Sequence, residues 1–166
     1  MTQSNPPIRR YWKMANPDSL NSLWFDVLGW VAYYFAQLEG ASYLIIESLE
    51  QTPAVRDVCC DLGYEKRSKV AAGLIAAKVA GDATLTADWQ AFWTKAIDAA
   101  PMRNKVLHNP LTKDLLAQEE MEEHDGVQVR KGKKSVLTLG AVQAYNDQLV
   151  ALNRELRDLL QRSKLV

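Results

Sequence analysis

The stretch RNKVLHNP, residues 103–110, places an arginine, an asparagine and a histidine near the end of a segment that otherwise resembles a core helix. An imidazole transfers protons near neutral pH, and a guanidinium offers a fixed fork of donors to a phosphate. In an α-helix Asn104 and His108 share a face, whereas Arg103 points roughly 140° away from His108. Contact between the two therefore requires the arginine to swing back, or a second copy of the helix to meet the first. These residue types suit phosphodiester cleavage without a metal ion.

The elements that must position these residues are predicted to be helices. Apolar residues recur three and four apart from Leu20 to about Leu49, which is typical of a long amphipathic helix capped by Asp18 or Ser19. Gly29 and Gly40 within it predict the close approach of another helix. Further helices are predicted over about 53–62, 65–80, 141–161 and 84–108, and the last of these is capped by Thr84 or Thr86. Pro101 either kinks that helix or starts a new turn.

A short β segment is predicted between the last two helices. Residues 127–129 and 135–139 could pair as a small hairpin about a turn at Lys131, Gly132 and Lys133. The expected fold is therefore all-α, a bundle of four or five helices with a small β-hairpin insertion near 127–139. We expect one domain over 1–166, in which 1–17 forms an extended N-terminal arm.

Composition limits the classes of function. The chain is 48% hydrophobic, and 20 basic residues balance 20 acidic ones, so attraction for RNA must come from local patches. Cys59 and Cys60 are adjacent and are not expected to pair, which favours the reducing cytoplasm. No apolar run reaches the roughly 18 residues of a membrane span, so no contact with a membrane is expected.

Arg103, Asn104 and His108 together resemble the motif of the HEPN superfamily (higher eukaryotes and prokaryotes nucleotide-binding). That motif is an arginine, a polar residue that is often asparagine, three further residues and a histidine, near the end of a long helix in a small bundle. The resemblance implies a homodimer in which two motifs face one cleft, and a metal-independent endoribonuclease without cofactors. It also implies a role as a toxin or in antiphage defence, with an antitoxin or defence protein as partner.

The resemblance also implies a mechanism and argues against one kind of partner. His108 would act as general base or acid on the RNA 2′-hydroxyl, Arg103 would stabilise the phosphorane and Asn104 would orient both. The products would carry 2′,3′-cyclic phosphate and 5′-hydroxyl ends. Pro110 stands where some toxins of the family carry a tyrosine that is adenylylated by a nucleotidyltransferase antitoxin, which argues against that partner.

Further residues are predicted to support RNA cleavage. Basic side chains could contact phosphates along the RNA backbone. Glu39 and Glu47 interrupt an apolar helix and could support the cleft from behind the catalytic groups. The predicted RNA contacts are Lys66, Arg67, Lys69, Lys105, Arg130, Lys131, Lys133 and Lys134.

Other interpretations of the same residues remain open. Arg103 could pair with a carboxylate while His108 only caps its own helix. The protein could be a non-catalytic HEPN-like module that binds RNA, nucleotide or a protein, or an adaptor bundle unrelated to the family. His124 lies in an acidic segment without a second histidine or cysteine at ligand spacing, so no metal site is expected. Aromatic residues at helical spacing favour a core or a dimer interface over a base-stacking surface. These aromatic residues are Tyr33, Tyr34, Tyr43, Trp89 and Trp93.

Overall fold

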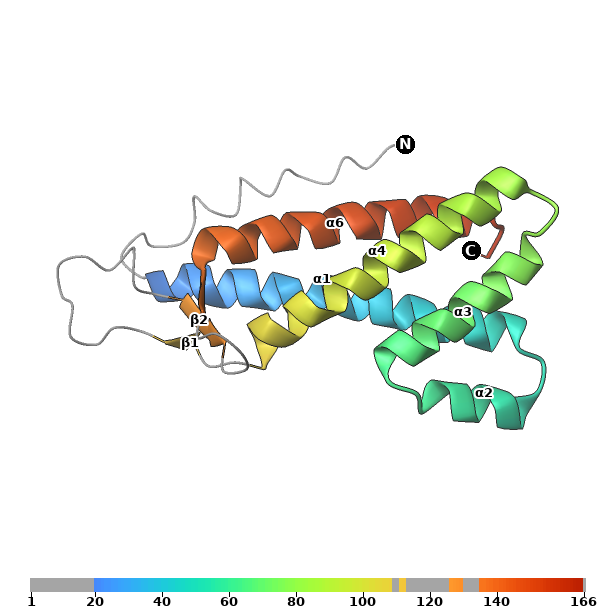
Figure 1. Cartoon of the computed structure of the whole chain (residues 1–166), viewed down its shortest axis with the longest axis horizontal. Helices are drawn as coiled ribbons and strands as arrows, with labels where there is room; N and C mark the ends of the chain where they lie inside the picture. Colours follow the sequence, from blue (N-terminus) through green and yellow to red (C-terminus); the bar gives the residue numbers. More distant parts are fainter. Residues whose placement is uncertain (1–19, 109–110, 113–125, 130–134, 166) are drawn as a thin grey trace.

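The computed structural model describes residues 20–108, 111–112, 126–129 and 135–165 (Figure 1). Within these ranges the chain forms five helices and three short strands. In chain order they are α1 (Leu20–Leu49), α2 (Pro53–Cys60), α3 (Tyr64–Lys78), α4 (Ala83–Leu107), β1 (Leu111–Thr112), β2 (Gly126–Val129), β3 (Ser135–Thr138) and α6 (Leu139–Arg162). The all-α bundle with a small β insertion is confirmed, and none of the described helices is long and apolar enough to cross a membrane.

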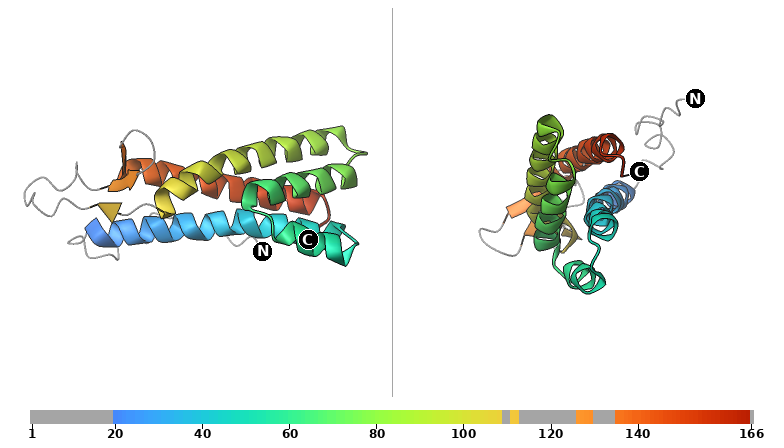
Figure 2. Two further views of the ribbon diagram at one scale, coloured as in Figure 1. Left: turned by 60° about the horizontal axis from the view of Figure 1, so that its bottom comes forward. Right: turned by 90° about the vertical axis from the view of Figure 1, so that its right-hand side faces the viewer.

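Three long helices form the body of the bundle. α1, α4 and α6 run lengthwise, α3 lies along one half of this body and the short α2 lies outside it (Figures 1 and 2). The predicted apolar stripe of α1 is buried, and α4 and α6 contribute stripes of their own to the same core. Full burial of each such side chain stabilises the fold by about 1.5–3 kcal/mol. Among the largest buried side chains are Trp24, Ile45, Trp89, Phe92 and Leu149.

The residue that caps α4 differs from the predicted one. α4 is capped by Asp82, whose carboxylate accepts a hydrogen bond of 2.9 Å from the Leu85 amide, so the prediction of Thr84 or Thr86 was wrong. The Thr86 hydroxyl donates instead to the carbonyls of Val79 and Asp82. Pro101 lies inside α4, which continues to Leu107.

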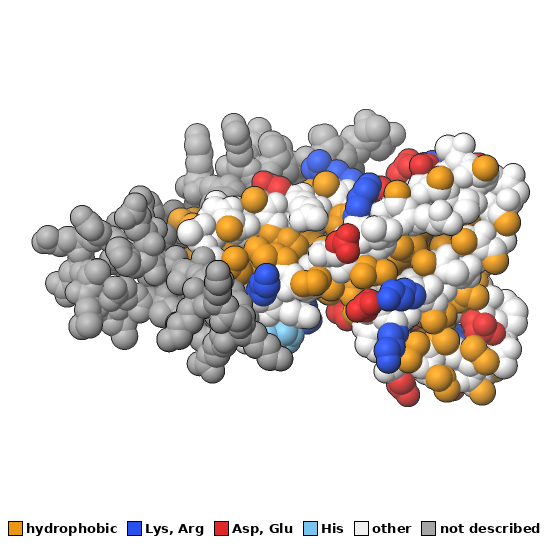
Figure 3. Space-filling model, in the orientation of Figure 1, with side chains coloured by type: hydrophobic (Ala, Val, Ile, Leu, Met, Phe, Trp, Pro, Cys, Tyr) orange, Lys and Arg blue, Asp and Glu red, His pale blue; other side chains and the backbone are white. Residues whose placement is uncertain are grey.

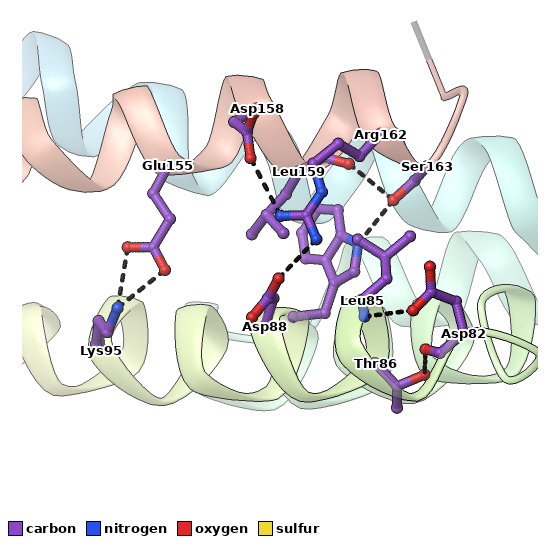
Figure 4. Close-up of polar contacts among 11 residues, drawn as sticks. Asp82, Leu85, Thr86, Asp88, Lys95, Glu155, Asp158, Leu159, Arg162 and Ser163 are labelled. Atoms are coloured by element: carbon purple, nitrogen blue, oxygen red, sulfur yellow. Dashed lines mark hydrogen bonds and ion pairs between the residues drawn. The ribbon is translucent and has the colours of Figure 1, made fainter.

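Polar contacts join α4 and α6 at the end of α4 that is remote from residues 103–108 (Figure 4). Trp89 Nε1 donates to Ser163 Oγ at 2.8 Å, and Ser163 in turn donates to the Leu159 carbonyl. Arg162 pairs with Asp88 at 2.6 Å. The pairing of α4 with α6 is therefore fixed at that end by a buried hydrogen bond, which contributes about 1 kcal/mol.

The β segment is an antiparallel sheet in the order β1-β2-β3. The predicted hairpin is present as β2 and β3, with Val127 opposite Leu137 and Val129 opposite Ser135. β1, which follows α4 directly, was not predicted and pairs with β2. The predicted hairpin turn at 131–133 and the N-terminal arm over 1–17 lie outside the described residues.

The two glycines of α1 do not mark contacts with other described residues. Among these residues, a Cβ atom added at Gly29 or Gly40 would meet nothing within 4 Å, and both glycines are exposed. The predicted approach of another helix of the same chain is therefore wrong for both positions.

Candidate functional site

The candidate site lies at the C-terminal end of α4. His108 is the C-cap residue of this helix, and its backbone amide donates to the Asn104 carbonyl at 3.1 Å. Its side chain is exposed. The last turn of α4 therefore presents the imidazole at the surface.

The arginine swings back toward the histidine within one chain. Arg103 Nη1 lies 2.8 Å from His108 Nε2 and 3.1 Å from Asn104 Oδ1. A guanidinium only donates hydrogen bonds, so Nε2 must be the acceptor. The ring in this arrangement is neutral, with its proton on Nδ1. Arg103, Asn104 and His108 thus form one hydrogen-bonded group within the chain.

The guanidinium of Arg103 has an unused donor. Its Nε is buried and has no hydrogen-bond partner among the described residues, although its Cζ lies 5.3 Å from the centre of the Phe35 ring. A buried donor without a partner costs about 1–3 kcal/mol. Across the described ranges no carboxylate forms an ion pair with Arg103. The described residues therefore do not show the carboxylate pair that the alternative interpretation of Arg103 requires.

Two tyrosines, the buried Tyr145 and the half-buried Tyr64, reach α4 from neighbouring helices, and sequence reasoning missed both. Tyr145 of α6 donates to the Ala99 carbonyl at 2.8 Å, and Tyr64 of α3 donates to the Ala96 carbonyl at 3.2 Å. Burial raises the pKa of Tyr145 well above its usual range, and burial also raises that of Tyr64 to about 12. A hydroxyl on the core stripe of an amphipathic helix requires a partner, which is the signal that could have identified Tyr145.

These shifts predict a loss of stability in alkali. The folded pKa of Tyr64 lies above the ordinary value of 10, so its contribution is complete below pH 10 and is lost as the pH rises towards 12. Between pH 9 and pH 12 the free energy of unfolding of wild type should fall by about 1–2 kcal/mol more than that of Tyr64→Phe, because the variant lacks the ionisable hydroxyl. Urea unfolding at successive pH values measures this difference. Equal losses in wild type and variant would contradict it.

The predicted supporting carboxylates do not contact the site residues. Glu39 pairs with Arg67 at 3.3 Å, and Glu47 is exposed on α1 about 18 Å along the helix from Phe35, given a rise of about 1.5 Å per residue. Within the described contacts neither acid binds Arg103 or His108, and their role behind the cleft stays a prediction.

Arg67 is a core residue. Its side chain is 4% exposed, and it donates to Ser42 Oγ, the Leu62 carbonyl and Glu39 while its Cζ lies 3.8 Å from the centre of the Tyr43 ring. With these donors occupied it does not reach an RNA backbone, and its prediction as an RNA contact was wrong.

Three of the remaining predicted RNA contacts lie among the described residues, and four do not. Lys66, Lys69 and Lys105 are exposed, and Lys69 pairs with Glu65 at 2.6 Å. On the face drawn in Figure 3 the basic side chains of the described residues are scattered and form no continuous patch. The remaining predicted contacts, Arg130, Lys131, Lys133 and Lys134, lie outside the described residues, as does His124.

The aromatic residues divide between core and surface. Trp89 and Trp93 are buried, as expected. Tyr33 is 54% exposed and contacts the rings of Trp30 and Tyr34. This small aromatic cluster on α1 therefore leaves much of its apolar surface uncovered.

The described residues form no cluster that suits a metal ion. Within the described ranges no group of three or more His, Cys, Asp or Glu side chains could hold a metal ion.

Comparison with protein-family models, with curated proteins and with solved structures finds no match to this chain. The function is therefore argued from the residues at the end of α4.

Proposed function

We propose that this protein is a metal-independent endoribonuclease of HEPN type that acts as a homodimer. The observation that carries the proposal is the contact of 2.8 Å between Arg103 Nη1 and His108 Nε2 at an exposed helix end. It joins a phosphate-binding cation to a group able to transfer a proton.

The chemistry follows from these groups. When a phosphate of RNA binds Arg103, the guanidinium turns from His108 to the phosphate oxygens and releases the lone pair of Nε2. His108 then removes the proton of the 2′-hydroxyl, the 2′-oxygen attacks phosphorus, and the bond from phosphorus to the 5′-oxygen breaks. Asn104 limits this movement of the guanidinium, because its Oδ1 atom accepts a hydrogen bond from Nη1. The departing 5′-oxygen takes a proton from water, and the hydroxide that remains takes the proton held by His108.

A surface of α1 suits a second copy of the chain. Of the six exposed large hydrophobic side chains among the described residues, four lie on α1: Phe25, Trp30, Tyr33 and Leu44. α1 contains no Lys or Arg, so this surface does not attract phosphate. The exposed Gly29 and Gly40 lie on the same helix and leave room for a partner. The large side chains of this face in one copy can fit against the glycines of the same face in the other copy, as a twofold interface requires.

This surface predicts the effect of a charge on dimerisation. Tyr33→Glu places a carboxylate in the proposed interface, and we expect dimer dissociation to become about 100-fold easier because the charge must be desolvated without a partner. Sedimentation equilibrium measures the dissociation constant. Val58→Glu on α2, where Val58 is 65% exposed, is the matched control and should dimerise as wild type does. A wild-type protein that sediments as a monomer at tens of micromolar would contradict the homodimer.

The activity itself is tested with RNA in EDTA. Purified protein should cleave a mixed RNA, and Arg103→Ala should remove this cleavage while the protein stays folded. If wild type and variant give the same background, the alternative of a non-catalytic module that binds RNA, nucleotide or a protein gains the support that the ribonuclease loses.

A further inference from the structure

The Arg103 guanidinium contacts two polar side chains at the surface. Its Nη1 lies 3.1 Å from Asn104 Oδ1 and 2.8 Å from His108 Nε2, and both of these partner residues are exposed. An exposed partner can exchange such a contact for water, so each hydrogen bond contributes little net stability. These two contacts therefore do not by themselves hold the arginine in one position.

On its buried side the guanidinium meets an aromatic ring. Arg103 Nε is buried and has no hydrogen-bond partner among the described residues, and Cζ lies over the Phe35 ring, 5.3 Å from its centre. A cation within about 6 Å of a ring centre is attracted by the negative charge on the face of the ring. The Phe35 ring therefore stabilises the guanidinium on the side that lacks a hydrogen bond.

Phe35 is itself fixed by the core of the bundle. Its side chain is 2% exposed, and its ring packs against the Tyr64 ring of α3 with 4.9 Å between the ring centres. The Tyr64 hydroxyl donates in turn to the Ala96 carbonyl of α4. A ring that is close-packed in this way keeps one orientation, so it offers the guanidinium a fixed surface.

The face and the edge of a guanidinium can serve different partners. Its five N–H groups lie in one plane, so contact of the face with a ring leaves the edge able to donate hydrogen bonds. Because Arg103 points roughly 140° away from His108 around α4, its side chain must bend back to reach Nε2. The contact with Phe35 supports this bent side chain while Nη1 contacts His108.

We propose that Phe35 is a positioning residue of the site, whose ring supports the Arg103 guanidinium and keeps its donor edge directed at His108 and at a bound phosphate. This inference rests on the proposed ribonuclease for its kinetic effect, although the contact between Arg103 and His108 does not depend on activity. Phe35 touches neither substrate nor the reacting atoms in this account.

The first test compares Phe35→Leu with Phe92→Leu. Both variants remove a buried ring, but Phe92 packs against Trp89 and Trp93, about 16 Å along α4 from Arg103 at a rise of about 1.5 Å per residue. We expect Phe35→Leu to lower kcat/KM for RNA cleavage about tenfold, because a misplaced guanidinium stabilises the transition state less. Phe92→Leu should stay within about twofold of wild type, although urea unfolding should show a similar loss of stability. Equal cleavage by the two variants would overturn the positioning role.

A second replacement separates the charge distribution of the ring from its packing. Pentafluorophenylalanine at position 35 nearly keeps the shape of phenylalanine, but its fluorine atoms withdraw the negative charge from the face of the ring. We expect it to lower kcat/KM about as much as Phe35→Leu does while the protein stays as stable as wild type. Wild-type cleavage by this protein would show that the ring only fills space, and it would overturn the proposed role.

A third measurement is independent of activity. The ¹⁵N resonance of His108 Nε2 reports whether this atom accepts a hydrogen bond, and we expect it to shift in both proteins altered at position 35 and to stay unchanged in Phe92→Leu. An unchanged resonance in the proteins altered at position 35, or equal shifts in all three, would overturn the positioning role. A wild type without ribonuclease activity would overturn the proposed function and leave this resonance to decide the role of Phe35.

Discussion

His108→Ala lowers the rate of RNA cleavage by about 10²–10⁴-fold in our account, because it removes the group that takes the 2′-hydroxyl proton. The substitution removes an exposed side chain at a helix end, and the backbone amide that completes α4 is retained. Stability should therefore change little. Single-turnover cleavage of a labelled RNA measures the rate, and thermal unfolding measures the stability.

The chain offers a matched control for this substitution. His124 is the other of its two histidines, and we expect His124→Ala to cleave within about twofold of wild type. Arg103→Lys retains the charge but not the two-pronged donor geometry, so it should fall between wild type and Arg103→Ala. Equal cleavage by wild type and His108→Ala would contradict the assigned role of the histidine.

Arg67→Ala is expected to destabilise the fold by about 2–4 kcal/mol, because it removes a buried side chain whose hydrogen bonds join α1 to the segment before α3. The Arg67 guanidinium connects Ser42 and Glu39 of α1 with the Leu62 carbonyl before α3. Loss of this side chain also leaves that carbonyl without the donor and creates a cavity beside Tyr43. Urea unfolding measures the change in free energy.

Lys69→Ala is the control for Arg67→Ala on the same helix. Lys69 and Glu65 form an exposed pair, with side chains that are each 63% exposed, and such pairs contribute about 0–1 kcal/mol. Arg67→Met should recover part of the stability that Arg67→Ala loses, because it fills the cavity. Similar unfolding free energies for Arg67→Ala and Lys69→Ala would contradict a structural role for Arg67.

The helices could be predicted because their burial follows local spacing. The stripe from Trp24 to Ile45 is buried as its period indicates. Arg67 was misassigned because its lysine neighbours suggested an exposed basic cluster. It nevertheless lies on the stripe of Ser68, Ala71 and Ile75, which are buried in α3, and this spacing could have placed it in the core.

Contacts between distant residues could not be predicted from spacing. Tyr145 and Ala99 are 46 residues apart, and nothing in their local sequence relates them. The cap of α4 was missed because Asp82, Thr84 and Thr86 are all suitable cap residues within five positions. In the candidate site, helix geometry left open whether Arg103 meets His108 of its own chain, and the flexibility of the arginine side chain allows that contact.

The measurement that tests the central claim most directly is the chemistry of the RNA ends formed in EDTA. Wild-type protein should produce 2′,3′-cyclic phosphate and 5′-hydroxyl ends, and a substrate with a single 2′-deoxy nucleotide at the cleavage position should resist cleavage there. The same cut in the 2′-deoxy substrate, or products with 3′-hydroxyl ends, would contradict an attack by the 2′-oxygen and with it the roles assigned to Arg103 and His108.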